Sequence, residues 1–374
     1  VMEKRRISPA ELAIGTVLSW DAYDEHGRLL LRKGQTIVSM SQIEGLTERG
    51  LYTGPEPERR KPPPEPILPS AVGLVVEARR RLQVMCSPNG SKERFPEHIA
   101  GIRTLIREAC AISYDAALAM TLLDRNGRYS IRHSVDAAIA CQVVGEASGI
   151  SEPELSSAVA GALTMNISML DLQDILQAQE APLTELQREL IKKHPEASTE
   201  FLRGCGVTDE LWLEVVLSHH EAIDGSGYKG TRGDAISLPA QLVSLADIYC
   251  ARISSRDYRA PLQPNAALRA LFLDQGKKVR DGLASQFIKA IGVFPSGTPV
   301  RLDNGEIAVV TGRGKSVKTP DVCAIIGTQG MPLVVPGRRD TSQPPFGVRE
   351  VVSWSTLGAP PSMQSLWGKV AAMH

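Results

Sequence analysis

The sequence predicts a mainly α-helical protein in which a helical core is flanked on each side by a small β-rich domain. Between residues 71 and 293, apolar residues recur at helical intervals, as in ILQAQEAPLTELQRELIKKH and DELWLEVVLSHHEAI. Before this region, GTVLSWDAYDEHGRLLLRKGQTI has two extended runs around turn-forming residues 24–27. After it, FPSGTPVRLDNGEIAVVTG alternates and turns at residues 304–305.

These changes of pattern predict four consecutive parts of the chain. Residues 1–54 form an N-terminal β-rich domain that closes with a short helix ending at Gly50. Residues 55–70 are a linker, because seven prolines between Pro55 and Pro69 favour a stiff, extended chain. Residues 71–293 form the helical domain. Residues 294–374 form a small, barrel-like C-terminal β domain, to which CAIIGTQGMPLVVPG adds further strands.

Composition narrows the class of protein. The 374 residues include 42 basic and 42 acidic side chains, so no net charge draws the chain toward nucleic acid or an anionic membrane. Six scattered cysteines without a CxxC pair suit a reducing compartment. No apolar run approaches the roughly 18 residues of a membrane span. We therefore expect a cytoplasmic protein with no membrane span and no nucleic-acid partner.

The histidines are concentrated in the helical region, and several fall where helices are expected to converge. A single helical histidine is more often structural than functional. Adjacent histidines differ, because they point about 100° apart on a helix and would need two separate buried partners. Imidazoles and a carboxylate from separate helices are suitable ligands for a transition metal inside a helical bundle. The candidate ligands are His133, His194, His219, His220 and Asp247.

The stretch LSHHEAIDGSGYKG, at residues 217–230, is the most unusual segment. Two acidic residues three positions apart follow the histidines, and three glycines then surround one tyrosine. Glycines permit positive φ and close backbone approach, as in a loop that folds over a site. A glycine-capped helix followed by an ordinary loop is the alternative interpretation. The residues concerned are Glu221, Asp224, Gly225, Gly227, Tyr228 and Gly230.

HHEAIDGSGY resembles the HHExxDGxGYP signature of the HD-GYP family, bacterial phosphodiesterases associated with cyclic di-GMP. RHSVDAAIA, IKKHPEASTEFL and LADIYCARISSRDYRAPLQPNAAL resemble further segments of that family in the same order. The resemblance covers roughly residues 100–292. It implies an HD-type helical bundle, a divalent transition metal such as zinc, iron or manganese, and cyclic di-GMP or a related nucleotide as ligand.

The resemblance also implies roles for individual residues. His194, His219 and His220 would hold one metal position, and His133 and Asp247 would belong to another. Arg256 and Arg259 would reach substrate phosphates, for which guanidinium groups are suited. Tyr228 would lie in a loop implicated in contacts with GGDEF-domain signalling proteins, although Lys229 replaces the proline of the signature.

One segment departs from the family pattern. Where the family has LLHDIGKxGI, this chain has ALTMNISMLDL, with Met165 at the histidine and Asn166 at the aspartate. A carboxylate can bridge two cations, whereas a neutral amide and a thioether are poor ligands for hard divalent ions. We therefore expect at most one metal ion and assign no catalytic residue with confidence.

Three functions remain open from the sequence. The first is a catalytically impaired HD-GYP protein that acts as a cyclic-di-GMP sensor or as a protein-interaction module. The second is an active phosphodiesterase with an atypical metal centre that yields pGpG or GMP. The third is a structural scaffold. Replacement of the pair by Met165 and Asn166 favours the first over the second. The four histidines and the HHExxDGxGY match favour both over the third, and whether the chain is an enzyme is left open.

Overall fold

The structure is a computed structural model that describes residues 5–6, 12–18, 20–48, 52–53, 69–87, 90–254, 261–274, 276–358 and 360–373. The chain divides into two compact units, Val1–Ile67 and Leu68–His374. The expected proline linker, except for Pro69 and Ser70, lies outside the described residues. The helical region and the C-terminal sheet fall in the second unit, so the boundary at residue 293 stays a prediction.

The first unit is a small sheet with one helix. Its antiparallel strands have the order β1-β4-β2-β3. Leu18, Ala22 and Ile37 are buried in its core, and α1 packs its buried Leu46 there. The expected short helix is present as α1, and its expected end at Gly50 lies outside the described residues. The elements are β1 (Arg5–Arg6), β2 (Ala22–Tyr23), β3 (Leu29–Leu31), α1 (Met40–Glu48) and β4 (Tyr52–Thr53).

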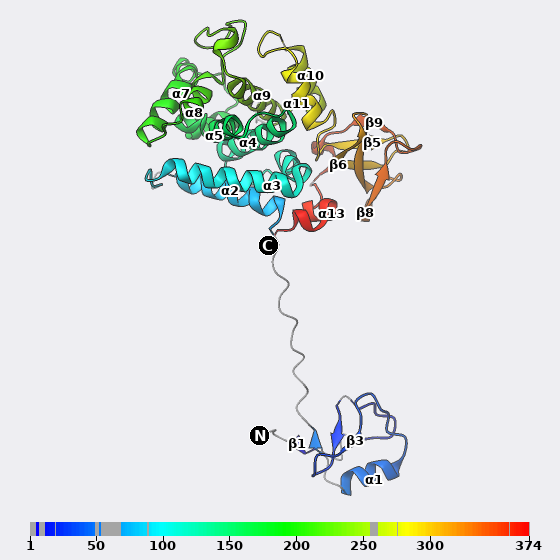
Figure 1. Cartoon of the computed structure of the whole chain (residues 1–374). Coiled ribbons are helices and arrows are strands. Elements are labelled where there is room, and N and C mark those ends of the chain that lie inside the picture. The colour runs from blue at the N-terminus through cyan, green and yellow to red at the C-terminus, as the bar shows by residue number, and fades with distance from the viewer. Residues whose placement is uncertain are drawn as a thin grey trace. The chain divides into compact units, whose positions relative to one another are not determined.

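The second unit is built on a helical core, as the apolar periodicity predicted (Figure 1). Polar residues begin several of its helices: Asp209 accepts a backbone amide ahead of α8, and Ser237 does so ahead of α9. The helices are α2 (Ala71–Met85), α3 (Phe95–Leu123), α4 (Tyr129–Ala147), α5 (Glu152–Thr164), the 3₁₀ turn η2 (Ile167–Met169), α6 (Leu170–Ala178), α7 (Glu185–Gly204), α8 (Glu210–Ser218), η3 (Gly233–Ala235), α9 (Leu238–Ile253), α10 (Pro264–Leu273) and α11 (Leu283–Ile291).

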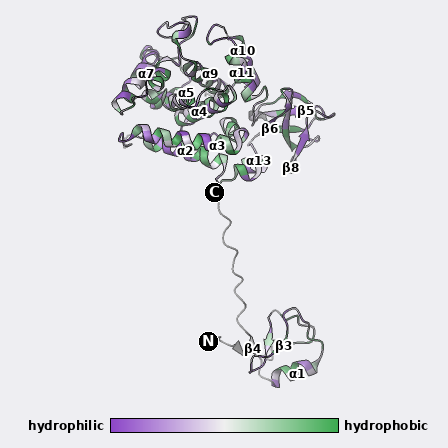
Figure 2. Cartoon of the chain, viewed as in Figure 1, coloured by the Kyte–Doolittle hydropathy of each residue, from purple (hydrophilic) through white to green (hydrophobic). Residues whose placement is uncertain are grey.

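Helices α4, α5 and α9 lie at the centre of this core, where most of their side chains are buried. The outer helices α2 and α7 carry both hydrophilic and hydrophobic residues (Figure 2). Glu152–Ala178 is long and apolar enough to cross a membrane, but 67% of its apolar window is buried inside the fold. We therefore assign this stretch to the core, because a helix that is apolar on all sides is buried at the centre of a helical domain.

The C-terminal part is an antiparallel sheet with the order β8-β7-β6-β5-β9, beside the helical core in Figure 1. The expected turn at residues 304–305 joins β5 to β6, with Gly305 at φ 89°. The segment also contains short helices that the alternating pattern did not predict. The elements are β5 (Pro299–Leu302), β6 (Ile307–Ser316), β7 (Thr319–Ile326), β8 (Pro332–Asp340), β9 (Val348–Val351), α12 (Trp354–Leu357), α13 (Met363–Trp367) and η4 (Gly368–Ala371).

Helix α3 bends where it meets this sheet. Ser113 has non-helical angles (φ −164°, ψ 97°), and its hydroxyl accepts a backbone amide three residues on, so the helix restarts there. The restarted half carries Asp115, which accepts a 2.6 Å hydrogen bond from the Ser296 hydroxyl. The Arg313 guanidinium lies 4.2 Å from the ring centre of Tyr114. These contacts join the sheet to the helical core.

Candidate metal centre

The candidate ligands come from four helices of the core. His133 lies on α4, His194 on α7 and Asp247 on α9, while His219 and His220 directly follow α8. His133, His194, His219 and Asp247 are buried, and His220 is partly buried. Helix packing thus brings together residues that are up to 114 positions apart in the sequence.

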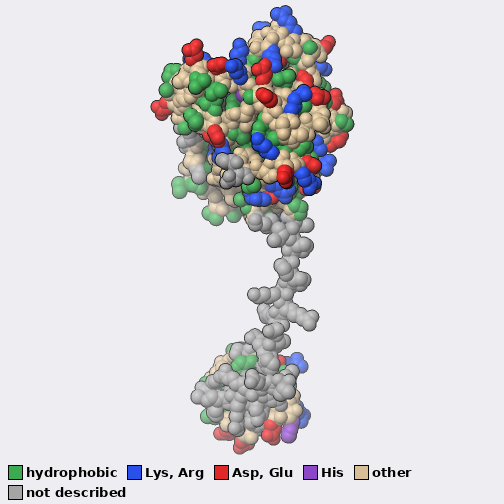
Figure 3. Space-filling model, turned by 90° about the vertical axis from the view of Figure 1, so that its left-hand side faces the viewer, with side chains coloured by type: hydrophobic (Ala, Val, Ile, Leu, Met, Phe, Trp, Pro, Cys, Tyr) green, Lys and Arg blue, Asp and Glu red, His purple; other side chains and the backbone are tan. Residues whose placement is uncertain are grey.

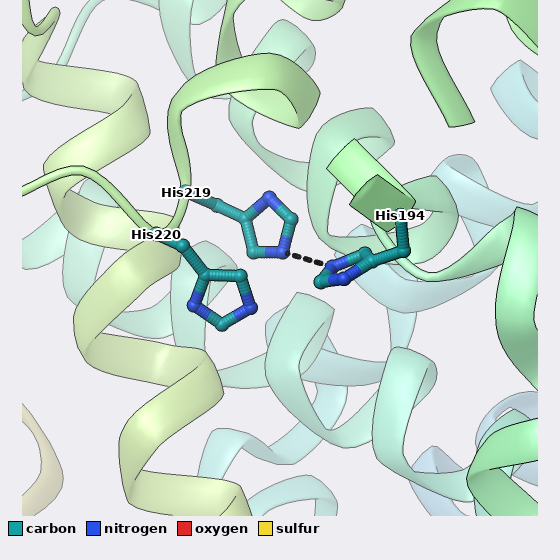
Figure 4. A group of neighbouring side chains, drawn as sticks. All are labelled: His194, His219 and His220. Carbon is teal, nitrogen blue, oxygen red and sulfur yellow. Dashed lines mark hydrogen bonds between the residues drawn. The ribbon is translucent and has the colours of Figure 1, made fainter. Parts of the chain in front are cut away.

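Three histidines form a compact group (Figure 4). One ring nitrogen from each of His194, His219 and His220 lies within 4.8 Å of the other two. The Nε2 atoms of His194 and His219 are 3.0 Å apart, and the rings of His219 and His220 have centres 4.2 Å apart. In the described part of the chain, this is the group whose geometry can hold a metal ion.

Backbone carbonyls fix the orientation of two of these rings. Nδ1 of His219 lies 2.7 Å from the carbonyl oxygen of Val216, and Nδ1 of His194 lies 2.5 Å from that of Ile191. A carbonyl only accepts, so Nδ1 must carry the proton in both rings, and each Nε2 presents a lone pair. Two lone pairs facing each other at 3.0 Å repel unless a cation or proton lies between them. The tautomers therefore suit metal binding, with the carbonyls acting as outer-shell partners.

Burial keeps these imidazoles neutral. It lowers the pKa of His194 to about 4, with a further contribution from His220. Burial, followed by His220 and His194, lowers the pKa of His219 well below its ordinary value, and burial also lowers the pKa of His220. Neutral imidazole is the form that coordinates metal, so the histidines are ready to bind near neutral pH without first losing a proton.

His133 and Asp247 lie beside the triad but bind each other. Nε2 of His133 donates to Oδ1 of Asp247 at 2.7 Å. Burial opposes ionisation of Asp247, but the hydrogen bond and charge of His133 outweigh it and hold the pKa of the carboxyl below its usual range. Nδ1 of His133 is buried and has no hydrogen-bond partner among the described residues. This arrangement already engages the two groups expected to form a second metal position.

The segment that departs from the family pattern adjoins the triad. Met165 and Asn166 directly follow α5 and are both buried, and Oδ1 of Asn166 has no hydrogen-bond partner in the described part of the chain. The Ser168 hydroxyl donates to the carbonyl of His194 at 3.1 Å. A cavity of about 230 Å³ opens between these elements, lined by residues that include Met169 and His194.

The glycine-rich loop folds back on the histidines, as expected from its sequence. The Glu221 carboxylate accepts the backbone amides of Lys229 at 2.9 Å and Thr231 at 2.8 Å, which closes the loop. The Tyr228 ring lies over His220, with centres 4.7 Å apart. A Cβ on Gly227 would lie 2.5 Å from the Cα of Glu221, so only glycine allows this close approach.

The remaining loop residues shape its turn. Asp224 accepts the backbone amide of Ser226 at 2.8 Å, and Gly225 follows with φ 82°. Lys229 forms an ion pair of 2.9 Å with Glu196 on α7. Sequence reasoning missed this pair, because nothing in the spacing relates the loop to that helix. It also missed the two carbonyl anchors, although each lies three residues before its histidine, where a helix places it.

The expected phosphate-binding residues Arg256 and Arg259 lie outside the described residues. Their assignment therefore stays a prediction. The roles of the other candidate residues are also predictions, although the structure brings His133, His194, His219, His220 and Asp247 to one region.

Comparison with known proteins agrees with the helical arrangement. The HD domain family matches residues 117–281. The cyclic di-GMP phosphodiesterase PA4108 of Pseudomonas aeruginosa is 29% identical over 56% of this chain and 50% of its own length. The cyclic di-GMP phosphodiesterase response regulator RpfG of Xanthomonas campestris is 30% identical over 52% and 48%, respectively. This chain spans about half the length of the curated relatives it matches.

Two other similarities are weaker. The 3'3'-cGAMP-specific phosphodiesterase 1 of Vibrio cholerae is 27% identical over 42% of this chain and 36% of its own length. The solved structure of Bd1817, an HDG"Y"P protein from Bdellovibrio bacteriovorus, covers 77% of this chain and 99% of its own, at 15% identity and a TM-score of 0.48.

The helical core with its histidine cluster is therefore an HD domain. In this domain the chain is similar to proteins named as cyclic di-GMP phosphodiesterases, in agreement with its resemblance to the HD-GYP family.

Proposed function

We propose that the helical domain holds one divalent transition-metal ion and binds cyclic di-GMP or a related cyclic dinucleotide beside it, with impaired hydrolysis. In this role it acts as a nucleotide sensor in bacterial signalling and conveys ligand binding to partner proteins, with GGDEF-domain proteins as candidates. The observation that carries the proposal is the triad His194, His219 and His220, whose nitrogens converge within 4.8 Å.

The residues present fit a single ion. Three neutral imidazoles are a known ligand set for zinc and leave a fourth position open to water or substrate. Imidazole also suits iron, and the donor set alone does not select between zinc, iron and manganese. The backbone carbonyls that hold His194 and His219 reduce the cost of ordering these ligands.

The residues present do not supply a second metal-binding position as suitable as the histidine triad. His133 and Asp247 satisfy each other, and a metal would have to break their 2.7 Å hydrogen bond. Asn166 offers one neutral carbonyl oxygen where a bridging anion is needed, and the thioether of Met165 is a soft ligand. Two-metal hydrolysis, which needs both ions to stabilise the attacking and leaving oxygens, is therefore disfavoured.

The chain's own residues would position the nucleotide. By family resemblance, Arg256 and Arg259 bind its phosphates, for which bidentate guanidinium groups are suited. Tyr228, held over His220 by the closed loop, offers an aromatic face beside the triad. A divalent ion on the triad would add Lewis-acid polarisation of the phosphodiester and of an attacking water.

An active phosphodiesterase that yields pGpG or GMP is the second candidate. It is favoured by the relatives, whose names describe phosphodiesterases of cyclic di-GMP or 3'3'-cGAMP. The intact triad and loop are compatible with it, since one metal ion can still activate water.

Calorimetric titration of cyclic di-GMP, paired with a chromatographic assay for pGpG and GMP in Mn²⁺ or Fe²⁺, tests both candidates. We expect saturable binding that weakens in Arg256→Ala and in His219→Ala, with turnover at or near background. A conservative Arg→Lys change at an exposed position of the same unit, Arg107→Lys, is the control. Turnover typical of an enzyme, at least about 1 per second, would support the second candidate. Absence of binding would refute both.

A further inference from the structure

The cavity of about 230 Å³ beside the histidine triad is not used by the proposed function as stated above. Residues of η2, α6 and α7 line it, and His194 is one of them. Met169, Leu190 and Ala197 contribute apolar walls. Cavities that hold a whole drug-sized ligand measure about 300–1,000 Å³, so this one suits one part of a cyclic dinucleotide rather than all of it.

Two opposite charges, Asp171 on α6 and Lys193 on α7, also line this cavity. Figure 3, which views the molecule from the α7 side of Figure 1, shows basic and acidic side chains close together among hydrophobic ones. Ion pairs orient both groups, because Arg128 holds Oδ1 of Asp171 at 2.6 Å and Glu189 holds Nζ of Lys193 at 2.6 Å. A carboxylate has about four acceptor positions and an ammonium group has three N–H donors, so each group can still bind a ligand.

This combination of groups is complementary to a guanine base. Guanine presents two neighbouring N–H donors, at N1 and N2, beside the acceptor O6. A carboxylate can accept from both donors, and lysine is a suitable donor to O6. Adenine would place its N1 acceptor against the same carboxylate, which leaves both groups unsatisfied. The thioether of Met169 is a favourable contact for the aromatic ring of the base.

We propose that this cavity receives one guanine base of the bound cyclic dinucleotide, with Asp171 on its N1–H and N2–H edge and Lys193 on O6. This inference rests on the proposed function, because the cavity holds one part of a ligand that binds beside the triad. His194 lines the cavity, so a base held there lies next to the candidate metal centre. One cavity recognises one base, and a dinucleotide with a single guanine therefore satisfies it.

Calorimetric titration of the full chain, supplied with Mn²⁺, tests this with three probes: cyclic di-GMP, 3'3'-cGAMP with one guanine, and cyclic di-AMP with none. We expect 3'3'-cGAMP to bind nearly as tightly as cyclic di-GMP. Cyclic di-AMP should bind roughly five- to hundredfold more weakly, which is the discrimination that one pair of hydrogen bonds to a base edge provides. Asp171→Asn should reduce this difference, and Glu108→Gln, at an exposed acid on α3, is the control that should preserve it.

A second variant fills the cavity without changing a candidate metal ligand. Ala197→Phe, at an exposed position of α7, should strongly weaken cyclic di-GMP binding while metal content stays at the wild-type value, and Ala100→Phe on α3 is the matched control. Circular dichroism confirms that the variants are folded. Equal binding of all three probes by the wild type, discrimination that persists in Asp171→Asn, or unchanged affinity in Ala197→Phe would overturn this inference and leave the proposed function standing. A wild-type chain that binds none of the probes would refute both.

Discussion

Replacing Asn166 by Asp should lower the stability of the metal-free chain and make its stability depend more strongly on a bound cation. Asn166 is 2% exposed, and its Oδ1 has no hydrogen-bond partner in the described part of the chain. A carboxylate there is buried without compensation, which costs several kcal/mol. Taking about 3 kcal/mol, and about 2–4 °C per kcal/mol for a domain of this size, the metal-free variant should melt about 6–12 °C below the wild type.

Mn²⁺ should recover much of this loss. A ligand at about one hundred times its dissociation constant stabilises the folded state by about 2.7 kcal/mol. Scanning calorimetry in chelator and in Mn²⁺ measures the metal-dependent shift in Tm, which should be larger for Asn166→Asp than for the wild type. Asn166→Ala removes the amide without adding charge, so its metal-dependent shift should match the wild type. Equal shifts in all three proteins would refute the account of this position.

Three further predictions concern protonation, the loop and packing. In the metal-free protein, the free energy of unfolding should fall by about 3 kcal/mol between pH 6.5 and 4. Burial lowers the folded-state pKa of His194 to about 4, so the unfolded chain takes up the proton first as the pH falls. Urea titrations should show a smaller pH dependence of stability in His194→Gln. Glu221→Ala leaves two loop amides unpaired, so their hydrogen exchange should accelerate at least tenfold, which unchanged protection would contradict. Gly161→Ala places a Cβ 2.3 Å from Cγ1 of Val215 and should cost about 1–3 kcal/mol, a loss that Val215→Ala partly relieves in the same unfolding assay.

Much of the helical core could be predicted from the sequence because its helices are amphipathic and polar residues begin several of them. The expected turn at residues 304–305 was also correct, since Gly305 supplies the positive φ that the turn needs. The helices α12 and α13 were missed. They are only four and five residues long, too short for a helical period to stand out from an alternating pattern.

The candidate site was predicted in part. The sequence identified which histidines converge, because HHEAIDGSGY and its neighbouring segments fix their order along the chain. It did not predict that His133 and Asp247 would bind each other, since side-chain partners depend on how α4 and α9 pack. Nor did it predict the kink at Ser113, where a hydroxyl competes with the helical hydrogen bond.

The central claim is that the triad His194, His219 and His220 holds one metal ion. Elemental analysis of the full chain, purified without chelator and supplied with zinc, iron or manganese, measures this most directly. We expect close to one equivalent in the wild type and a large loss in His219→Ala, with His98→Ala as control. Two equivalents in the wild type, or one equivalent that persists in His219→Ala, would contradict it.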